Sequence, residues 1–212
     1  MTEGMSLRER KKLQTRHRLW TAATELFAER GFDKVSVAEI AEVAEVSKMT
    51  VFNYFASKED LVLAPLAEHI GDVARVVRDR APGESALTAV RAQFLAAIER
   101  RDPSVGMSDA PMVLDVSRLI QETPALLIRA HALSLRSHEL LAEVLTEEGE
   151  EPPVARIVAA QLISTRNSLI LANQLRLLAG EPADAIAADA VALAERGLDL
   201  LARGLGTFAI RR

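Results

Sequence analysis

The stretch VSKMTVFNYFASKEDL, residues 46–61, concentrates side chains that can hydrogen-bond to another molecule. Its polar members include Lys48, Thr50, Asn53, Tyr54 and Lys58. An Asn side chain can pair with adenine through two hydrogen bonds, apolar groups can contact the methyl group of thymine, and Lys or Thr can reach guanine or phosphate. The segment is too short to enclose a core of its own, so neighbouring helices must position these groups.

Val51 and Phe55 lie one helical turn apart and are the expected buried anchors of a short helix in this stretch. At about 100° per residue, the side chains between them point away from the core. The outward face then carries Lys48, Met49, Thr50, Phe52 and Asn53. An ordinary amphipathic helix with a polar outside is the alternative. Exposure of Met49 and Phe52 together favours a surface for the DNA major groove, because water gives no reason to place them there.

Three serines are expected to start helices in this region: Ser36, Ser47 and Ser57. Glu39 follows Ser36 by three residues, the spacing of a capping box. Upstream, an apolar stripe predicts a first helix over about 7–30, with Gly31 as its C-terminal cap. Helices shorter than about 12–15 residues are marginal alone in water. The two short helices that start at Ser36 and Ser47 must therefore pack against each other and against the first helix. This arrangement predicts a helix-turn-helix motif over about 36–55.

The rest of the chain is also predicted to be helical, which makes the fold class all-α. A fourth helix is expected from Ser57 to about Arg80. Further helices are expected near 84–101, 110–122, 124–147, 153–179 and 183–204, where Gly, Pro and acidic residues separate the periodic segments. No segment has the sustained alternation that is typical of a strand.

Composition and charge narrow the possible functions. Cysteine is absent, which excludes a disulfide scaffold and a thiolate metal site. No run approaches the ~18 apolar residues of a membrane span, and the charged N-terminal segment is unlike a secretory signal, so we expect a cytoplasmic protein with no membrane partner. Net charge is −4, yet residues 1–58 hold ten Lys and Arg against eight Asp and Glu.

Most of the N-terminal positive charge lies in one run: Arg8, Arg10, Lys11, Lys12, Arg16 and Arg18. A run of this kind can be a solvated terminus. It becomes a phosphate-binding arm if a nucleic-acid-binding module follows it.

Residues 10–65 resemble the N-terminal domain of TetR-family transcriptional regulators. The resemblance rests on LFAERGF at the end of the first helix, SVAEIA in the second, VSKMTVFNYF over the third and ASKEDL at the start of the fourth. Past residue 70, only the helical layout and the length agree with the family.

The resemblance implies a homodimer of about nine helices per chain, with an N-terminal three-helix helix-turn-helix DNA-binding domain (1–57) and a C-terminal helical ligand-binding and dimerisation domain (58–212). Such a protein is a ligand-responsive regulator, most often a repressor that a small molecule releases from a palindromic operator in double-stranded DNA. An activator on the same architecture would have an indistinguishable sequence pattern.

Carried over by position, two sets of residues are expected to contact DNA. The base edges would face Lys48, Met49, Phe52 and Asn53. The phosphates would be bound by Ser36, Val37, Ser47, Thr50, Tyr54 and Lys58, helped by helix N-termini. Packing or capping is the alternative role for Tyr54 and Lys58.

Glu45 departs from the family pattern, because relatives usually have Gly in the turn between the second and third helices. If the position requires a positive φ, a residue with a side chain costs on the order of 1 kcal/mol. Glu45 also places a negative charge near the DNA-binding face. We therefore expect altered turn geometry or modest affinity.

The larger domain is expected to supply the dimer interface and the effector site. The helix over about 153–179 is apolar on nearly every face, and the helix over about 183–204 is rich in Ala and Gly, so both are expected at a four-helix interface between two subunits. Arg129, Arg166 and Asn167 are candidate pocket residues. An Arg facing a cavity favours an anionic or carbonyl-bearing ligand.

Enzyme and metal motifs are not found in the sequence: it has neither a Gly-rich phosphate loop nor an HExxH or ExxH pair. We expect no enzymatic activity, no metal and no cofactor. The alternative to a regulator is a helical ligand-binding or interaction protein whose DNA-binding domain is weak or silent, a reading supported by the negative net charge and by Glu45.

Overall fold

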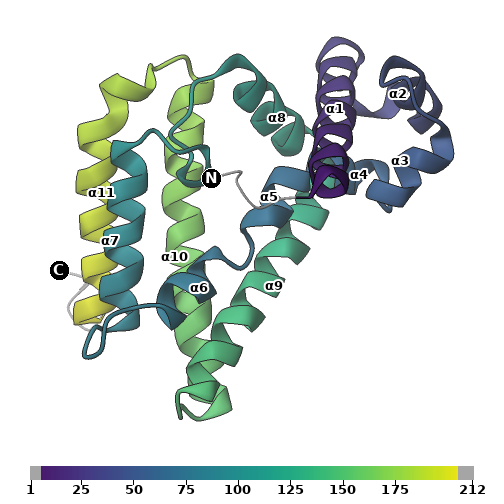
Figure 1. Ribbon diagram of the computed structural model, residues 1–212. Coiled ribbons are helices and arrows are strands. Elements are labelled where there is room, and N and C mark those ends of the chain that lie inside the picture. The colour runs from purple at the N-terminus through teal and green to yellow at the C-terminus, as the bar shows by residue number, and fades with distance from the viewer. Residues whose placement is uncertain (1–5, 205–212) are drawn as a thin grey trace. The chain divides into compact units, whose positions relative to one another are not determined.

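The computed structural model describes residues 6–204, and every regular element in this range is a helix (Figure 1). The α-helices are α1 (Leu7–Arg30), α2 (Val37–Val43), α3 (Lys48–Tyr54), α4 (Lys58–Val62), α5 (Ala64–His69), α6 (Asp72–Arg78), α7 (Ala86–Glu99), α8 (Pro111–Glu122), α9 (Pro124–Glu147), α10 (Pro152–Leu178) and α11 (Ala183–Arg203). Two 3₁₀ helices, η1 (Phe32–Lys34) and η2 (Pro103–Val105), connect them. The all-α prediction is confirmed. The parts of the expected domains at 1–5 and 205–212 lie outside the described residues.

The prediction of a single helix from Ser57 to about Arg80 is wrong, because this stretch forms three helices, α4, α5 and α6. Pro65 has no N–H with which to continue the α4 hydrogen-bond ladder to the Leu61 carbonyl. The second break includes Gly71, and glycine weakens a helix interior by about 1 kcal/mol relative to alanine. Counted as one, the three pieces leave nine α-helices among residues 6–204, the number that the resemblance implies.

The described chain divides into two compact units. The N-terminal unit contains the residues up to Ala67 together with Asp115–Ala130, and the C-terminal unit contains Glu68–Leu114 and the residues from His131 onward. The expected boundary at 57/58 cuts this N-terminal unit, since Leu61 and Val62 of α4 are fully buried in a helix that contacts α1. Burying these apolar side chains holds α4 with the helices that precede it.

The N-terminal unit forms because α1, α2, α3 and α4 each bury apolar side chains and each begin with a serine side-chain cap. In α1, Leu19, Ala23 and Phe27 are buried at the spacing expected of a helix, and α1 contacts both α2 and α4. The rings of Phe27 and Phe32 lie 5.1 Å apart, which ties η1 to the end of α1. Helices α2 and α3 lie together beside α1 (Figure 1). The predicted helix-turn-helix arrangement is therefore present.

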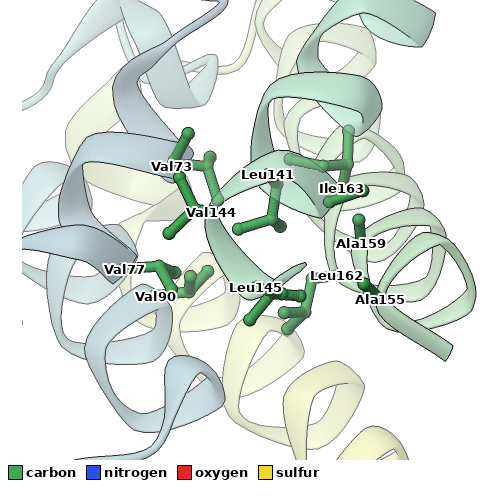
Figure 2. Packing of buried hydrophobic residues seen from close by; sticks show 12 residues of the cluster. Val73, Val77, Val90, Leu141, Val144, Leu145, Ala155, Ala159, Leu162 and Ile163 are labelled. Atoms are coloured by element: carbon green, nitrogen blue, oxygen red, sulfur yellow. The ribbon is translucent and has the colours of Figure 1, made fainter. Parts of the chain in front are cut away.

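The C-terminal unit has two apolar clusters. The first joins α6, α7, α9 and α10, and Figure 2 shows the side chains of Leu141 and Val144 on α9 among those of Val73 and Ile163. The second joins α7, η2, α10 and α11 around residues such as Phe94. Helices α7, α10 and α11 run side by side in Figure 1. Both clusters join residues that are far apart in the sequence, so their burial holds the helices of this unit together.

The η2 turn packs closely against α10, where two side chains hydrogen-bond to its carbonyl groups. Asn173 donates from Nδ2 to the Val105 carbonyl oxygen at 3.0 Å, and Arg166 donates from Nη2 to the Ser104 carbonyl oxygen at 3.1 Å. Directly after the turn, Gly106 adopts a left-handed conformation with φ +70°. A Cβ on Gly106 would lie 2.6 Å from the carbonyl oxygen of Ile170, which lies between Arg166 and Asn173 on α10. Only glycine allows this approach without displacing the turn.

Candidate nucleic-acid interface

Helix α3 is a short helix with a defined start and a defined end. Ser47 caps it: the Thr50 backbone N–H donates to Ser47 Oγ at 3.0 Å, and the two hydroxyl oxygens lie 2.8 Å apart. At the other end, the Phe55 backbone N–H donates to the Val51 carbonyl oxygen at 2.9 Å. Val51 and Phe55 are buried, so the prediction that they anchor this helix is confirmed.

The side chains on the opposite side of α3 lie in solvent. Met49 is 70% exposed and Phe52 is 45% exposed. Lys48 and Asn53 are also exposed, and Lys48 Nζ lies 6.0 Å from the centre of the Phe52 ring. The four residues expected to meet base edges therefore share the exposed surface of one helix, which we call the α3 reading face. Their contact with DNA remains a prediction.

The turn between α2 and α3 has the hydrogen bonds of a Schellman motif. The Val46 N–H donates to the Ala41 carbonyl oxygen at 2.9 Å, and the Glu45 N–H donates to the Glu42 carbonyl oxygen at 3.0 Å. Glu45 has φ +52°, so the position does require the left-handed conformation that glycine favours. The expected alteration of the turn is not seen, because Glu45 adopts the glycine geometry at an energetic cost.

Replacing Glu45 by glycine is expected to raise the free energy of unfolding by about 1 kcal/mol, because the left-handed strain is removed. It should also tighten DNA binding. Urea titration measures the first effect and fluorescence anisotropy with operator DNA measures the second. Glu45→Gln separates the causes, since it removes the charge and keeps the strain. Unchanged or weaker binding by Glu45→Gly would contradict the prediction.

Several residues expected to bind phosphate have partners within the protein. The Ser36 N–H and Oγ–H both donate to Glu39 Oε2, each at 2.8 Å, and the Glu39 N–H donates back to Ser36 Oγ at 3.3 Å. This confirms the predicted capping box. The hydrogen bonds from Ser36, followed by one from Arg30, lower the pKa of Glu39 from 4.5 to about 2. The stabilisation from this carboxylate is therefore present above pH 4.5 and is lost as the pH falls towards about 2.

Ser47 and Thr50 likewise use their hydroxyl groups to cap α3. Val37 and Tyr54 are partly exposed. Phosphate binding at all these positions remains a prediction, and a backbone N–H at a helix start is the group best suited to it.

Lys58 is turned inward. Its Nζ donates to the Phe32 carbonyl oxygen at 2.7 Å and to the Val35 carbonyl oxygen at 3.2 Å, and it lies 4.0 Å from the centre of the Phe32 ring. The ammonium group thus ties the start of α4 to η1 and to the residue before the Ser36 cap. These contacts favour the packing role that the sequence left open, with one N–H of the ammonium still available for a phosphate.

Replacing Lys58 by methionine is expected to lower the free energy of unfolding by about 1–2 kcal/mol, because a charged donor to two carbonyl groups is lost. Methionine keeps the length of the stem. Lys34→Met is the control, since Lys34 is exposed on η1 and its loss should change stability by less than about 0.5 kcal/mol. Equal stability of the two variants in urea would contradict the structural role, and uniformly weaker binding of all DNA would then indicate a phosphate contact.

Two ion pairs in the N-terminal unit were missed by the sequence reasoning. Arg30 Nη2 lies 2.7 Å from Glu39 Oε1 and joins the end of α1 to the first turn of α2. Arg129 Nη2 lies 2.9 Å from Asp60 Oδ1 and joins α9 to the first turn of α4. Neither pair has a local sequence signal, because the partners are nine and 69 residues apart.

The three candidate pocket residues have separate partners. Arg129 pairs with Asp60, Asn167 donates from Nδ2 to Ser134 Oγ at 2.8 Å, and Arg166 donates to the Ser104 carbonyl. Arg166 differs from the other two because its Nε is buried without a hydrogen-bond partner among the described residues. Its guanidinium carbon lies 5.9 Å from the centre of the Phe94 ring, and burial lowers the pKa of Arg166.

Helix α10 has one exposed stripe in addition to its buried one. Successive members are three or four residues apart: Val154, Ile157, Gln161, Ser164, Ser168, Leu171 and Leu175. The four large apolar members are 43–58% exposed. A stripe with this spacing is typical of the seam between packed helices.

Within residues 6–204, no group of three or more His, Asp or Glu side chains is placed to hold a metal ion. None of the helices in this range has the length and apolarity that crossing a bilayer requires.

Comparison with known proteins bears on the N-terminal unit directly. The model of the tetR family of bacterial regulatory proteins matches residues 19–64, which include α2, α3 and α4. Over these residues the chain matches the TetR family. The HTH-type transcriptional regulator TcmR of Streptomyces glaucescens is 34% identical over 160 residues, which cover 74% of this chain and 65% of TcmR. The chain thus spans just under two thirds of the length of this curated relative.

Solved structures of bacterial regulators share the fold over most of the chain. One is NalD of Pseudomonas aeruginosa, the secondary repressor of the MexAB-OprM multidrug efflux pump, with a TM-score of 0.57 and 20% identity over 87% of this chain and 96% of NalD. Another is a TetR-family regulator of Streptomyces coelicolor A3, with a TM-score of 0.50 and 26% identity over 88% of this chain and 96% of that one.

Proposed function

We propose that this TetR-family protein is a sequence-specific DNA-binding transcriptional regulator that responds to a small molecule, and that it acts as a repressor. The observation that carries the proposal is the α3 reading face, where Met49 and Phe52 are exposed beside Lys48 and Asn53 on a helix anchored by buried residues. The family match and the curated relative TcmR, a transcriptional regulator, support it. The matched family is bacterial, and bacterial transcription takes place in the cytoplasm, so we propose that the protein acts there.

The basic N-terminal half of α1 fits the same function. Arg8, Arg10, Lys11 and Lys12 are all exposed in the first turns of this helix. Exposed cations of this kind bind DNA phosphates without reading the sequence. We therefore favour the phosphate-binding role over a merely solvated terminus.

Selection of random duplex DNA by the purified protein, at two salt concentrations, tests the proposal. We expect a palindromic motif with half-sites about one helical turn, roughly 34–36 Å, apart. Affinity should fall steeply with salt, because bound phosphates release counterions. Absence of any motif at low salt would favour the alternative, a helical ligand-binding protein whose DNA-binding domain is silent.

We further propose a homodimer through α10 and α11, with the exposed stripe of α10 at its centre. The apolar ends of the stripe, Val154 and Ile157 at one end and Leu171 and Leu175 at the other, are surfaces that a second copy would bury.

The double variant Leu171→Glu/Leu175→Glu is expected to shift the protein from dimer to monomer, because paired carboxylates would be buried at the two-fold interface. Analytical ultracentrifugation measures the shift. Arg156→Glu is the control: Arg156 is exposed on α10 outside the stripe, and this variant should remain dimeric. A double variant that remains dimeric would place the interface elsewhere.

For the effector, we propose a molecule with an anionic or carbonyl group near Arg166. Two features support this proposal. The buried Nε of Arg166 has no hydrogen-bond partner among the described residues and suits a polar group of the ligand, and the Phe94 ring beside the guanidinium suits an apolar part. No ligand role is proposed for Arg129 or Asn167, whose side chains already have partners. A ligand-bound structure in which Arg166 contacts only protein atoms would contradict the assignment.

A further inference from the structure

The α3 reading face is unusually apolar for a surface that is expected to meet a polyanion. Met49 and Phe52 are three residues apart, so they are neighbours on the same side of the helix. Phosphate and sugar oxygens offer such side chains no favourable contact. In the major groove, the apolar group that distinguishes the bases is the C5 methyl group of thymine.

Lys48 and Phe52 form a pair within this face. Lys48 Nζ lies 6.0 Å from the centre of the Phe52 ring, one helical turn away, and both side chains are exposed. Base pairs are stacked about 3.4 Å apart, so two groups held this close reach the same base pair or neighbouring ones. A lysine in the major groove most often binds guanine O6 and N7.

We propose that each half-site contains a guanine next to a thymine, with Lys48 bound to the guanine and Phe52 against the thymine methyl group, and that Met49 contacts a second thymine methyl group. This inference rests on the proposed DNA-binding function. The inference specifies which bases the protein recognises and which atoms of those bases it contacts.

The test for the methyl contacts uses the operator recovered by selection, with each thymine replaced in turn by deoxyuridine. This change removes the methyl group and keeps every hydrogen-bonding group. Two positions per half-site are expected to bind about fourfold more weakly, the factor that corresponds to about 0.8 kcal/mol for one buried carbon. One of the two should neighbour a guanine.

Variants assign each methyl group to its side chain. Phe52→Ala should bind the unmodified operator more weakly and lose its sensitivity to deoxyuridine at the thymine beside guanine. Met49→Ala should lose the sensitivity at the other position only. Both residues are exposed, so circular dichroism and thermal unfolding are expected to match the unsubstituted protein. Operator binding with no sensitivity to deoxyuridine, or with sensitivity that neither variant changes, would overturn the inference.

The guanine contact has its own test. Replacing the neighbouring guanine by 7-deazaguanine removes N7, and it should weaken binding by the unsubstituted protein but not by Lys48→Ala. If Lys48→Ala weakens all DNA sequences equally and keeps the sensitivity to 7-deazaguanine, Lys48 binds phosphate and the proposed guanine contact is wrong. Failure to recover any operator would overturn the DNA-binding function itself, an outcome distinct from an operator that is insensitive to these changes.

Discussion

Replacing Gly106 by alanine is expected to lower the free energy of unfolding by about 3 kcal/mol. The left-handed backbone at φ +70° costs an alanine about 1–2 kcal/mol. The new methyl group would also lie 2.6 Å from the Ile170 carbonyl oxygen and 3.0 Å from Gln174 Cγ, and such overpacking typically costs about 1–3 kcal/mol. Relief of the clash requires the η2 turn to move away from α10.

That movement has a further cost, because the hydrogen bonds from Asn173 and Arg166 to the carbonyl groups of Val105 and Ser104 depend on the position of the turn. Urea unfolding at a fixed protein concentration measures the total, since the stability of a dimer varies with concentration.

Gly83→Ala is the matched control for Gly106→Ala. Gly83 has φ +83°, yet a Cβ on it would meet nothing within 4 Å. Alanine at position 83 therefore loses only the backbone contribution, about 1–2 kcal/mol. Equal losses at the two positions would mean that close packing of η2 on α10 contributes nothing, which would contradict the structure at this point.

Replacing Asn53 by alanine is expected to weaken operator binding about 5- to 150-fold, because loss of a two-bond contact to adenine costs about 1–3 kcal/mol. The base preference should relax at one position in each half-site. Asn53 is exposed, so the free energy of unfolding should change by less than about 0.5 kcal/mol. Fluorescence anisotropy with the operator and with its single-base variants measures both effects.

Non-specific DNA provides the control for Asn53→Ala. Asn53 is uncharged, so binding to a scrambled duplex and the dependence of affinity on salt are expected to stay the same. An equal loss on operator and scrambled DNA would indicate that Asn53 binds the backbone. An unchanged affinity for the operator would show that Asn53 makes no contact with a base.

The N-terminal unit could be predicted in detail because its signals are local. The capping box of Ser36 and Glu39, the cap at Ser47 and the buried pair Val51 and Phe55 all join residues three or four positions apart. Such pairs form whatever the rest of the chain does. The positive φ of Glu45 was also foreseeable, since a Schellman turn imposes it on any residue at that position.

Side-chain partners across long sequence separations could not be predicted in the same way. Lys58 binds a carbonyl group 26 residues away, Arg166 one 62 residues away and Arg129 a carboxylate 69 residues away. A long cationic side chain can reach several partners, and packing selects among them. For this reason the sequence did not show that Lys58, expected to bind phosphate, and Arg166 and Arg129, expected near a ligand, also hold protein groups together.

The sequence by itself determined the helical class, the family of the N-terminal unit and the face that α3 exposes, because helix periodicity and capping depend on near neighbours. Only the tertiary structure decided which helices share a core and that Gly106 must stay a glycine. These features depend on which surfaces exclude water together, and that is settled when distant segments meet.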